Sequence, residues 1–260
     1  MPRQPRRISM TGIYHIMTRG INKEQIFNRI IYKNKILDAI TKIRDELEFN
    51  IIAYCVMNNH MHLLIKIDDS ILELFMKKLN VRFAIFYNKV EDRYGHVFQD
   101  RFKSEPVEDE RYFIGVIRYI HNNPVKAGMV NHIEKYIWSS AKDYINQNSK
   151  FIPDNYLNDV IGLFKNIDEF IKFHNLEDDN IYIDTVEGEN ESIKNLINKI
   201  INEFFKENKI IGNNRVSIAK KEELAEILLK LNLITYREIA ELCNLSYYKG
   251  FEIAKNLKAE

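Results

Sequence analysis

Cysteine and long apolar runs are scarce in this chain. The two cysteines, Cys55 and Cys243, lie far apart among the 260 residues and form no CxxC pair. That argues against a disulfide framework or a cysteine zinc site and suits a reducing compartment. No stretch approaches the ~20 apolar residues of a membrane span, and no apolar signal region follows the basic start MPRQPRRISM. We therefore expect a cytoplasmic protein with no membrane partner.

Net charge is also small, but it is unevenly distributed. Residues 1–130 carry 21 Lys and Arg against 15 Asp and Glu, a net of +6. Residues 131–260 carry 17 against 22, a net of −5. The basic first half favours a polyanionic partner, although an ordinary solvated surface explains the charge equally well.

Hydrophobic periodicity predicts a βαββαβ order in the first half of the chain. The predicted strands are residues 11–18, 50–57 and 60–67, and residues 97–107 suit a fourth strand or an extended arm. The predicted helices are residues 32–48 and 71–90. A further helix is expected from about residue 110 to 122, capped by Asp109 and ended by Pro124. This order predicts an α+β fold of the ferredoxin-like or RRM-like kind, with an antiparallel sheet whose first and third strands are central neighbours.

The rest of the chain reads as helical. Residues 151–175 are apolar and helix-like, whereas residues 177–191 are acidic with no basic residue and predict a solvated linker. We divide the chain into an α+β domain at 1–148, a helical extension with an acidic linker at 149–191, and a small all-α domain at 192–260.

Two histidines interrupt the apolar third strand, within YCVMNNHMHLLIKI. His60 and His62 are two residues apart, so in a strand they project from the same face. Adjacent imidazoles can bind a divalent cation, and two histidines without a ligand are the simpler interpretation. On the later helix, Tyr119 and Asn123 are four residues apart and share a face. An amide oxygen could complete a metal shell beside a tyrosine nucleophile, or Tyr119 is an ordinary half-buried tyrosine.

Several longer stretches then match a known family in order and spacing. They are YHIMTRG at 14–20, AYCVMNNHMHLLI at 53–65, GHVFQDRFKS at 95–104, RYIHNNPVKAGMV at 118–130 and WSSAKDY at 138–144. Over about residues 11–146 the chain resembles the single-tyrosine HUH transposases, and most of all the REP-associated tyrosine transposases. Asn58 is a departure, since many members have proline there.

The resemblance implies a metal-dependent nuclease and strand transferase for single-stranded DNA that folds into hairpins. It implies that His60, His62 and Asn123 bind Mg²⁺ or Mn²⁺, and that Tyr119 attacks a phosphodiester to give a 5′-phosphotyrosine link. The alternatives are a transposase-derived regulator that binds nucleic acid without cutting it, and an RRM-like RNA platform.

Further residues are candidates for contacts with DNA. Arg19, Arg101 and Lys103 lie within the matched stretches and could contact phosphates. Near the C-terminus, a capping box at Thr235–Glu238 and a turn before Ser246 resemble a helix-turn-helix. The exposed start of its second helix would place three residues at DNA: Tyr247, Tyr248 and Lys249. A small interaction or dimerisation module is the alternative, and a homodimer is left open.

Overall fold

The computed structural model describes residues 6–176, 180, 182–183, 185–208, 216–231 and 234–257. The chain forms two compact units, Met1–Asp184 and Thr185–Glu260. None of the described helices has the length and apolarity needed to span a membrane.

The first unit is built on a four-stranded antiparallel sheet. The strands are β1 (Ile13–Arg19), β2 (Phe49–Val56), β3 (His60–Ile67) and β4 (Lys103–Pro106), in the spatial order β2-β3-β1-β4. This is the ferredoxin-like order, so the predicted α+β fold class is confirmed, with β3 central and next to β1. β4 is shorter than the arm expected over 97–107, because the earlier part of that arm makes only a single bridge, between Gly20 and Phe98.

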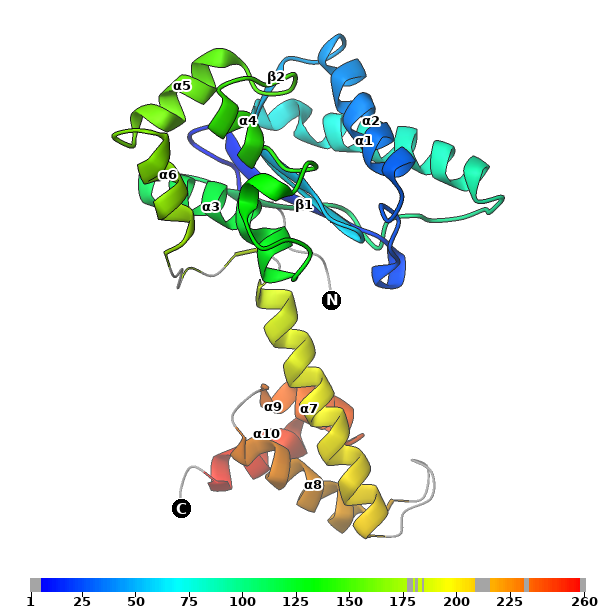
Figure 1. Ribbon diagram of the computed structural model, residues 1–260. Helices are drawn as coiled ribbons and strands as arrows, with labels where there is room; N and C mark the ends of the chain where they lie inside the picture. The colour runs from blue at the N-terminus through cyan, green and yellow to red at the C-terminus, as the bar shows by residue number, and fades with distance from the viewer. Residues whose placement is uncertain are drawn as a thin grey trace. The chain divides into compact units, whose positions relative to one another are not determined.

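Helices cover both faces of this sheet (Figure 1). The first unit contains α1 (Ile30–Arg44), α2 (Asp69–Val90), α3 (Glu110–Lys126), α4 (Ala141–Asn146), α5 (Asp154–Gly162) and α6 (Ile167–His174), with short 3-10 turns at Ile21–Lys23 and Ile133–Lys135. Neighbouring residues of a strand point to opposite faces. Tyr14 donates its hydroxyl to Asp69 at the start of α2, whereas the next residue, His15, contacts Tyr119 of α3. The sheet therefore has α2 on one face and α3 on the other.

The expected end of the helix before Pro124 is wrong. α3 continues to Lys126, and the backbone N–H of Ala127 still bonds to the carbonyl of Asn123. Proline lacks one N–H and disfavours a helical residue before it, but here it falls in the last turn of a helix that is buried along one side. Tertiary packing holds the backbone helical, so Tyr119 and Asn123 lie on one continuous helix.

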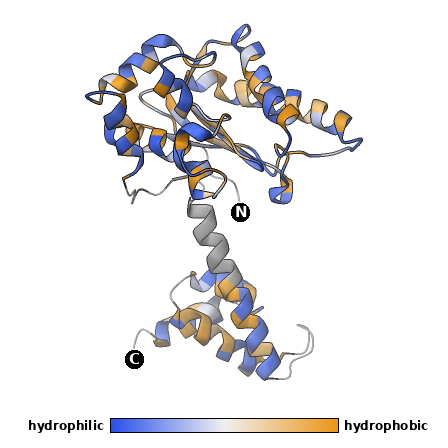
Figure 2. Ribbon diagram, viewed as in Figure 1, coloured by the Kyte–Doolittle hydropathy of each residue, from blue (hydrophilic) through white to orange (hydrophobic). Residues whose placement is uncertain are grey.

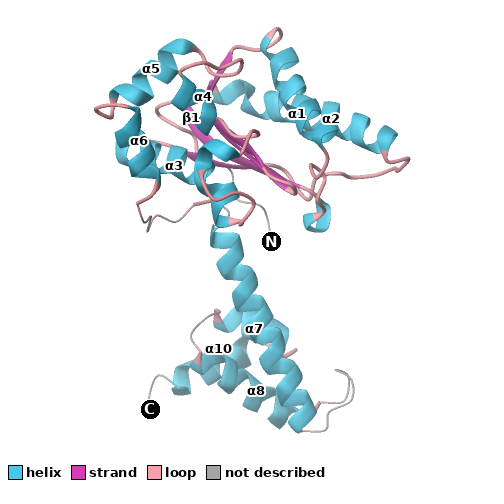
Figure 3. Ribbon diagram, viewed as in Figure 1, coloured by secondary structure: helices cyan, strands magenta, loops and turns pink. Residues whose placement is uncertain are grey.

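Helices joined by turns and loops make up the described residues of the second unit, as Figure 3 shows. Its helices are α7 (Thr185–Glu207), α8 (Ile218–Lys230), α9 (Tyr236–Leu242) and α10 (Tyr247–Leu257). Apolar and polar residues alternate along α8 and α10 (Figure 2), and one set of buried side chains forms the core: Ile197, Phe204, Leu224, Ala225, Leu228, Ile239, Cys243 and Ile253. The expected all-α region is confirmed.

The turn between α9 and α10 has the predicted chemistry. The capping box of Thr235 and Glu238 is present, and the Ser246 hydroxyl accepts a bond from the Lys249 backbone N–H at 3.2 Å. Gly250, inside α10, is needed for close packing, because a Cβ there would lie 2.9 Å from the Cβ of Ala240. Glycine is unfavourable inside a helix, but here it lets the two helices approach each other.

Candidate active site

His60 and His62 lie side by side on central strand β3, as the strand periodicity predicts. Their ring centroids are 4.9 Å apart with the rings perpendicular, at 89°. His60 Nδ1 donates to the side-chain oxygen of Asn59 at 2.6 Å, and His62 Nδ1 bonds to Nε2 of His15 at 3.0 Å. His62 and His15 are fully buried, while His60 is half-buried. The pair is therefore oriented by protein groups that hold one nitrogen of each ring.

This donor set fits a divalent cation. Histidine ligands usually bond through their second ring nitrogen to a protein group, which fixes the ring and its tautomer. Because the Nδ1 atoms of His60 and His62 make these bonds, a cation would bind at their Nε2 atoms. The described residues contain no group of three or more His, Cys, Asp and Glu side chains placed to hold a metal ion, so the remaining ligands would have to be amide, water or substrate oxygens.

Helix α3 packs over this strand and brings Tyr119 to the histidines. The Tyr119 ring centroid lies 5.5 Å from that of His62 and 5.8 Å from that of His15. The helix is held there by a buried apolar side that includes Val116 and Ile120. The helix that carries Tyr119 and Asn123 therefore packs on the strand that carries the two histidines.

Asn123 lies one turn beyond Tyr119 on the same helix. Its side-chain nitrogen donates to the carbonyl oxygen of Tyr119 at 3.4 Å, so its side-chain oxygen is the atom suited to ligation. The ammonium of Lys126 lies 5.5 Å from the Tyr119 ring centroid. A positive charge at that distance favours negative charge developing on the phenolic oxygen.

Tyr119 is covered by a residue from the acidic stretch. Its side chain is only 6% exposed, and the ring of Tyr182 stacks on it at a centroid distance of 4.1 Å and an angle of 23°. Tyr182 is itself 1% exposed. The stretch expected to be a solvated linker therefore contains an aromatic side chain that is buried in the first unit.

The predicted DNA-contacting residues of the first unit fall in two places. Arg19 pairs with His60 across the sheet, and Lys103 shares the partner Met17 with His62. Paired residues of antiparallel strands share a face, so Arg19 and Lys103 lie on the face of the histidines. Arg101 lies elsewhere, lining a cavity with residues of α2.

A buried hydrogen-bond chain that the sequence did not predict lies behind Tyr119 and contains His121 and His174. His174 Nδ1 lies 2.8 Å from the carbonyl oxygen of Phe170, which can only accept, so Nδ1 carries the proton. Burial lowers the pKa of His174 to about 4 and lowers that of His121 well below its usual range. Both rings are therefore neutral near pH 7. It follows that His121 Nδ1 donates to His174 Nε2 at 2.9 Å, and that Ser140 Oγ donates to His121 Nε2 at 2.8 Å.

This buried histidine chain, Ser140–His121–His174, joins three elements. Ser140 Oγ also accepts the backbone N–H of Tyr54 in β2 at 2.9 Å, His121 belongs to α3, and His174 ends α6. It fixes the rotation of α3 two residues from Tyr119. Two members of this chain, His121 and Ser140, lie inside the stretches that match the family, and that position was the only sequence feature that pointed to them. His174 lies outside those stretches, so no sequence feature pointed to it.

A buried lysine supports the turn that carries the histidines. Lys33 Nζ donates to the Val56 carbonyl at 3.2 Å, the Asn58 side-chain oxygen at 2.9 Å and the Tyr136 hydroxyl at 2.7 Å. Burial lowers the pKa of Lys33 to about 8. Asn58, the departure from the family pattern, is therefore held in place by Lys33 two residues before His60.

In the second unit, the three predicted residues differ in their contacts. Tyr248 is 73% exposed, and Tyr247 is exposed with its hydroxyl 2.8 Å from that of Tyr236. The ammonium of Lys249 is within 3.3 Å of Glu222 and 3.2 Å of Glu252. The two tyrosines are thus presented to solvent, while Lys249 is engaged by carboxylates.

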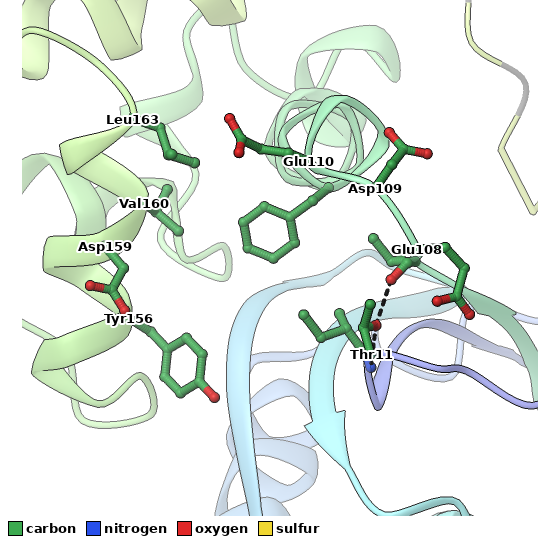
Figure 4. Close-up of a pocket in the computed structure, with 11 residues that line it drawn as sticks. Thr11, Glu108, Asp109, Glu110, Tyr156, Asp159, Val160 and Leu163 are labelled. Atoms are coloured by element: carbon green, nitrogen blue, oxygen red, sulfur yellow. Dashed lines mark hydrogen bonds between the residues drawn. The ribbon is translucent and has the colours of Figure 1, made fainter.

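A separate cavity of about 320 Å³ lies where β1, α3 and α5 meet, as Figure 4 shows. Four carboxylates stand among its apolar walls: Glu108, Asp109, Glu110 and Asp159. The predicted site residues, all of which the structure describes, are not among those that line it. Its negative charge disfavours phosphate, so we do not assign it to DNA.

Comparison with known proteins yields transposases. Residues 9–123 match the family described as "Transposase IS200 like". The chain is 25% identical over 120 residues to a Haemophilus influenzae protein named "Putative REP-associated tyrosine transposase", a match that covers 42% of this chain and 68% of that protein. A solved structure of a REP-associated tyrosine transposase bound to a REP hairpin is 18% identical, with a TM-score of 0.49, covering 58% of this chain and 89% of that one.

Proposed function

We propose that the chain, whose residues 9–123 match the IS200-like transposase family, cleaves and rejoins single-stranded, hairpin-forming DNA through Tyr119. The observation that supports this most directly is the placement of the Tyr119 ring 5.5 Å from His62. A tyrosine nucleophile beside an oriented histidine pair has the parts that a phosphodiester transfer requires.

The proposed reaction needs no external energy source. Tyr119 Oη attacks the phosphorus and forms a bond to it, while the bond from phosphorus to the 3′ oxygen breaks. The proton lost by the tyrosine is balanced by the proton gained by the leaving 3′-hydroxyl. The product is a 5′-phosphotyrosine, and attack by the same or another 3′-hydroxyl reverses the step and rejoins a strand. Lys126, whose ammonium lies 5.5 Å from the Tyr119 ring centroid, is proposed to stabilise the phenolate during attack.

We propose that His60, His62 and Asn123 hold the divalent cation, Mg²⁺ or Mn²⁺. A bound cation would polarise the phosphate and offset charge that develops on it. The chain's own contribution is orientation: Asn59 and His15 fix the two rings. Arg19 and Lys103, on the same sheet face, are proposed to contact DNA phosphates, and Arg101 to contact phosphates farther away.

The main competing function is a regulator that binds nucleic acid without cutting it. The presence of Tyr119, His60, His62 and Asn123 together favours the enzyme, because a binding protein needs no nucleophile. An RNA platform would require exposed aromatic residues on the central strands. The corresponding sheet face carries histidines instead, under α3.

A covalent-adduct assay tests the proposal. The protein is incubated with labelled single-stranded hairpin DNA and Mn²⁺, and a denaturing gel is examined for a protein–DNA adduct. The adduct is expected with wild type, absent after EDTA treatment and absent in Tyr119→Phe. Tyr94→Phe is the matched control, because Tyr94 is 94% exposed and lies outside the site. Adduct formation by Tyr119→Phe would refute the nucleophile assignment. Loss of DNA binding, rather than of cleavage, in His60→Ala would refute the metal role.

For the second unit we propose DNA binding through Tyr247, Tyr248 and Lys249. Exposed aromatic rings at the start of α10 support this, whereas the carboxylates around Lys249 reduce its contribution. Tyr248→Ala is expected to weaken binding of duplex DNA, measured by fluorescence anisotropy. A Tyr248→Ala variant that binds as wild type does would instead favour the interaction or dimerisation module.

A further inference from the structure

Three tyrosine rings form a parallel stack along α3. Tyr112 and Tyr119 are seven residues apart, two helical turns, and so lie on the same side of the helix. The ring of Tyr182 lies between them, 5.9 Å from Tyr112 at 19° and 4.1 Å from Tyr119 at 23°. The sum of the two centroid distances is close to the ~10.5 Å that a helix rises over the seven residues from Tyr112 to Tyr119. The stack therefore consists of two fixed rings with a third ring inserted.

The space that holds Tyr182 is made by a glycine. Gly115 lies on α3 between the two flanking tyrosines, and a Cβ there would be 2.9 Å from the Tyr182 hydroxyl oxygen and 3.2 Å from the side-chain nitrogen of Asn180. Glycine inside a helix is less stable than alanine, so its position needs a reason. Here it leaves room for a planar group, which we call the ring slot: the space between Tyr112 and Tyr119 over Gly115.

The occupant of the ring slot comes from outside the helix that forms it. Tyr182 follows α4, α5 and α6 in the sequence, so it is far along the chain from α3. Tyr182 is only 1% exposed, so its whole ring is enclosed. Tyr119 is only 6% exposed while Tyr182 is in place. At this exposure Tyr119 offers little open surface to a phosphate while Tyr182 is in place. Displacing Tyr182 would leave the rings of Tyr112 and Tyr119 facing a space of one ring.

We propose that the ring slot binds one unpaired DNA base adjacent to the scissile phosphate, and that Tyr182 occupies the base's position when DNA is absent. This rests on the proposed function, since Tyr119 is both the nucleophile and one wall of the slot. Proteins that bind single strands stack bases on aromatic side chains, and every base offers a planar face for this. A nucleotide whose phosphate meets the Tyr119 hydroxyl brings its neighbouring base beside the Tyr119 ring, where Tyr112 supplies the second face.

Binding measured without chemistry tests the slot. All proteins carry Tyr119→Phe, which keeps the ring and prevents the adduct, and EDTA is present. The probe is a fluorescein-labelled DNA hairpin with an unpaired thymine tail, compared with the same hairpin whose tail is abasic. Adding Tyr182→Ala is expected to tighten binding of the thymine-tailed hairpin by about 5- to 150-fold, the range that base–aromatic stacking gives. The abasic tail is expected to lose this gain, as is a chain that also carries Tyr112→Leu.

The controls separate stacking from simple exposure. Tyr182→Phe keeps the inserted ring and is expected to bind within about twofold of the parent. Tyr182→Leu keeps apolar volume in the core and replaces the alanine variant if Trp138 fluorescence shows that variant unfolded. An equal gain with the abasic tail would overturn the proposal, because the effect would then be phosphate access alone. No gain with either tail would overturn it as well.

Failure of the slot and failure of the proposed function give different results. A chain with native Tyr119 and Tyr182→Ala is incubated with the thymine-tailed hairpin and Mn²⁺. A base-dependent gain in binding without any covalent adduct would support the slot and refute the cleavage function. An adduct formed equally well with thymine and abasic tails would support cleavage and refute the slot.

Discussion

Removing the Ser140 hydroxyl is expected to destabilise the first unit more than most single-atom changes. Ser140 is fully buried, and its Oγ makes two bonds in the assigned chain, accepting from the Tyr54 N–H at 2.9 Å and donating its one proton to His121 Nε2 at 2.8 Å. The Tyr54 carbonyl oxygen, 3.2 Å away, is the other acceptor within reach of that proton. Ser140→Ala removes both bonds. β2 is an edge strand whose outer side makes one isolated bridge, Cys55 to Ser139, so among the described residues the Tyr54 N–H bonds to the Ser140 hydroxyl rather than to a neighbouring strand.

The magnitude follows from the two groups left behind. A buried donor or acceptor that loses its partner costs about 1–3 kcal/mol. The substitution leaves one donor, the Tyr54 N–H, and one acceptor, His121 Nε2, so the expected loss is about 2–6 kcal/mol. No large cavity is added, because only one oxygen atom is removed.

Urea denaturation followed by tryptophan fluorescence measures this directly. Trp138 is the only tryptophan of the chain and stands two residues from Ser140, so its emission reports the first unit alone. Ser139→Ala is the matched control. Ser139 is also buried, but its Oγ accepts one longer bond, from the Ala141 N–H at 3.3 Å, so we expect a smaller loss.

A double-mutant cycle provides the refutation. In a His121→Leu background there is no His121 Nε2 that could lose its donor, so Ser140→Ala should reduce the unfolding free energy by less than it does in wild type. The expected coupling free energy between the two substitutions is about 0.5–3 kcal/mol. Equal losses in both backgrounds, or a single-variant loss under about 1 kcal/mol, would refute the tautomers and directions assigned to the buried histidine chain.

Three further outcomes are expected. Because burial lowers the pKa of His121 and His174, the unfolded chain binds more protons than the folded chain between pH ~6.5 and ~4. Stability should therefore decrease as the pH is lowered through that window, and His174→Asn should make the decrease in urea midpoint smaller. Lys33 has a pKa of about 8 when folded and 10.5 as its ordinary value, so its contribution to stability should rise with pH between those values. Lys33→Met should remove that rise when urea midpoints at pH 8 and pH 10 are compared with wild type. Gly250→Ala should push α10 from Ala240 and destabilise the second unit by about 1–3 kcal/mol, seen as faster amide exchange in α9 and α10; unchanged exchange would contradict the close packing.

The sheet was predictable because its signals are local and repeated. Alternation of apolar residues indicated strands, turn residues separated β2 from β3, and the βαββαβ order then left few topologies. The length of β4 was not predictable, since its strand-like sequence pairs over only four residues. Pro124 misled for a related reason, because its local preference was overcome by the packing of α3.

In the candidate site, too, residues close together in the sequence could be predicted, whereas residues brought together from distant segments could not. The spacing of His60 and His62, and that of Tyr119 and Asn123, placed each pair on a common face. The supporting residues gave no such signal. Lys33 reaches the Tyr136 hydroxyl, 103 positions away in the chain, and no periodicity links two positions so far apart.

By itself the sequence determined which side chains share a face, because strand and helix repeats are set by backbone geometry within a few residues. Only the tertiary structure decided that α3 lies over β3, that the His121 and His174 rings join, and that Tyr182 enters the stack of Tyr112 and Tyr119. Those contacts depend on how buried surfaces fit together between distant segments, and that fit is a property of the packed unit rather than of any stretch within it.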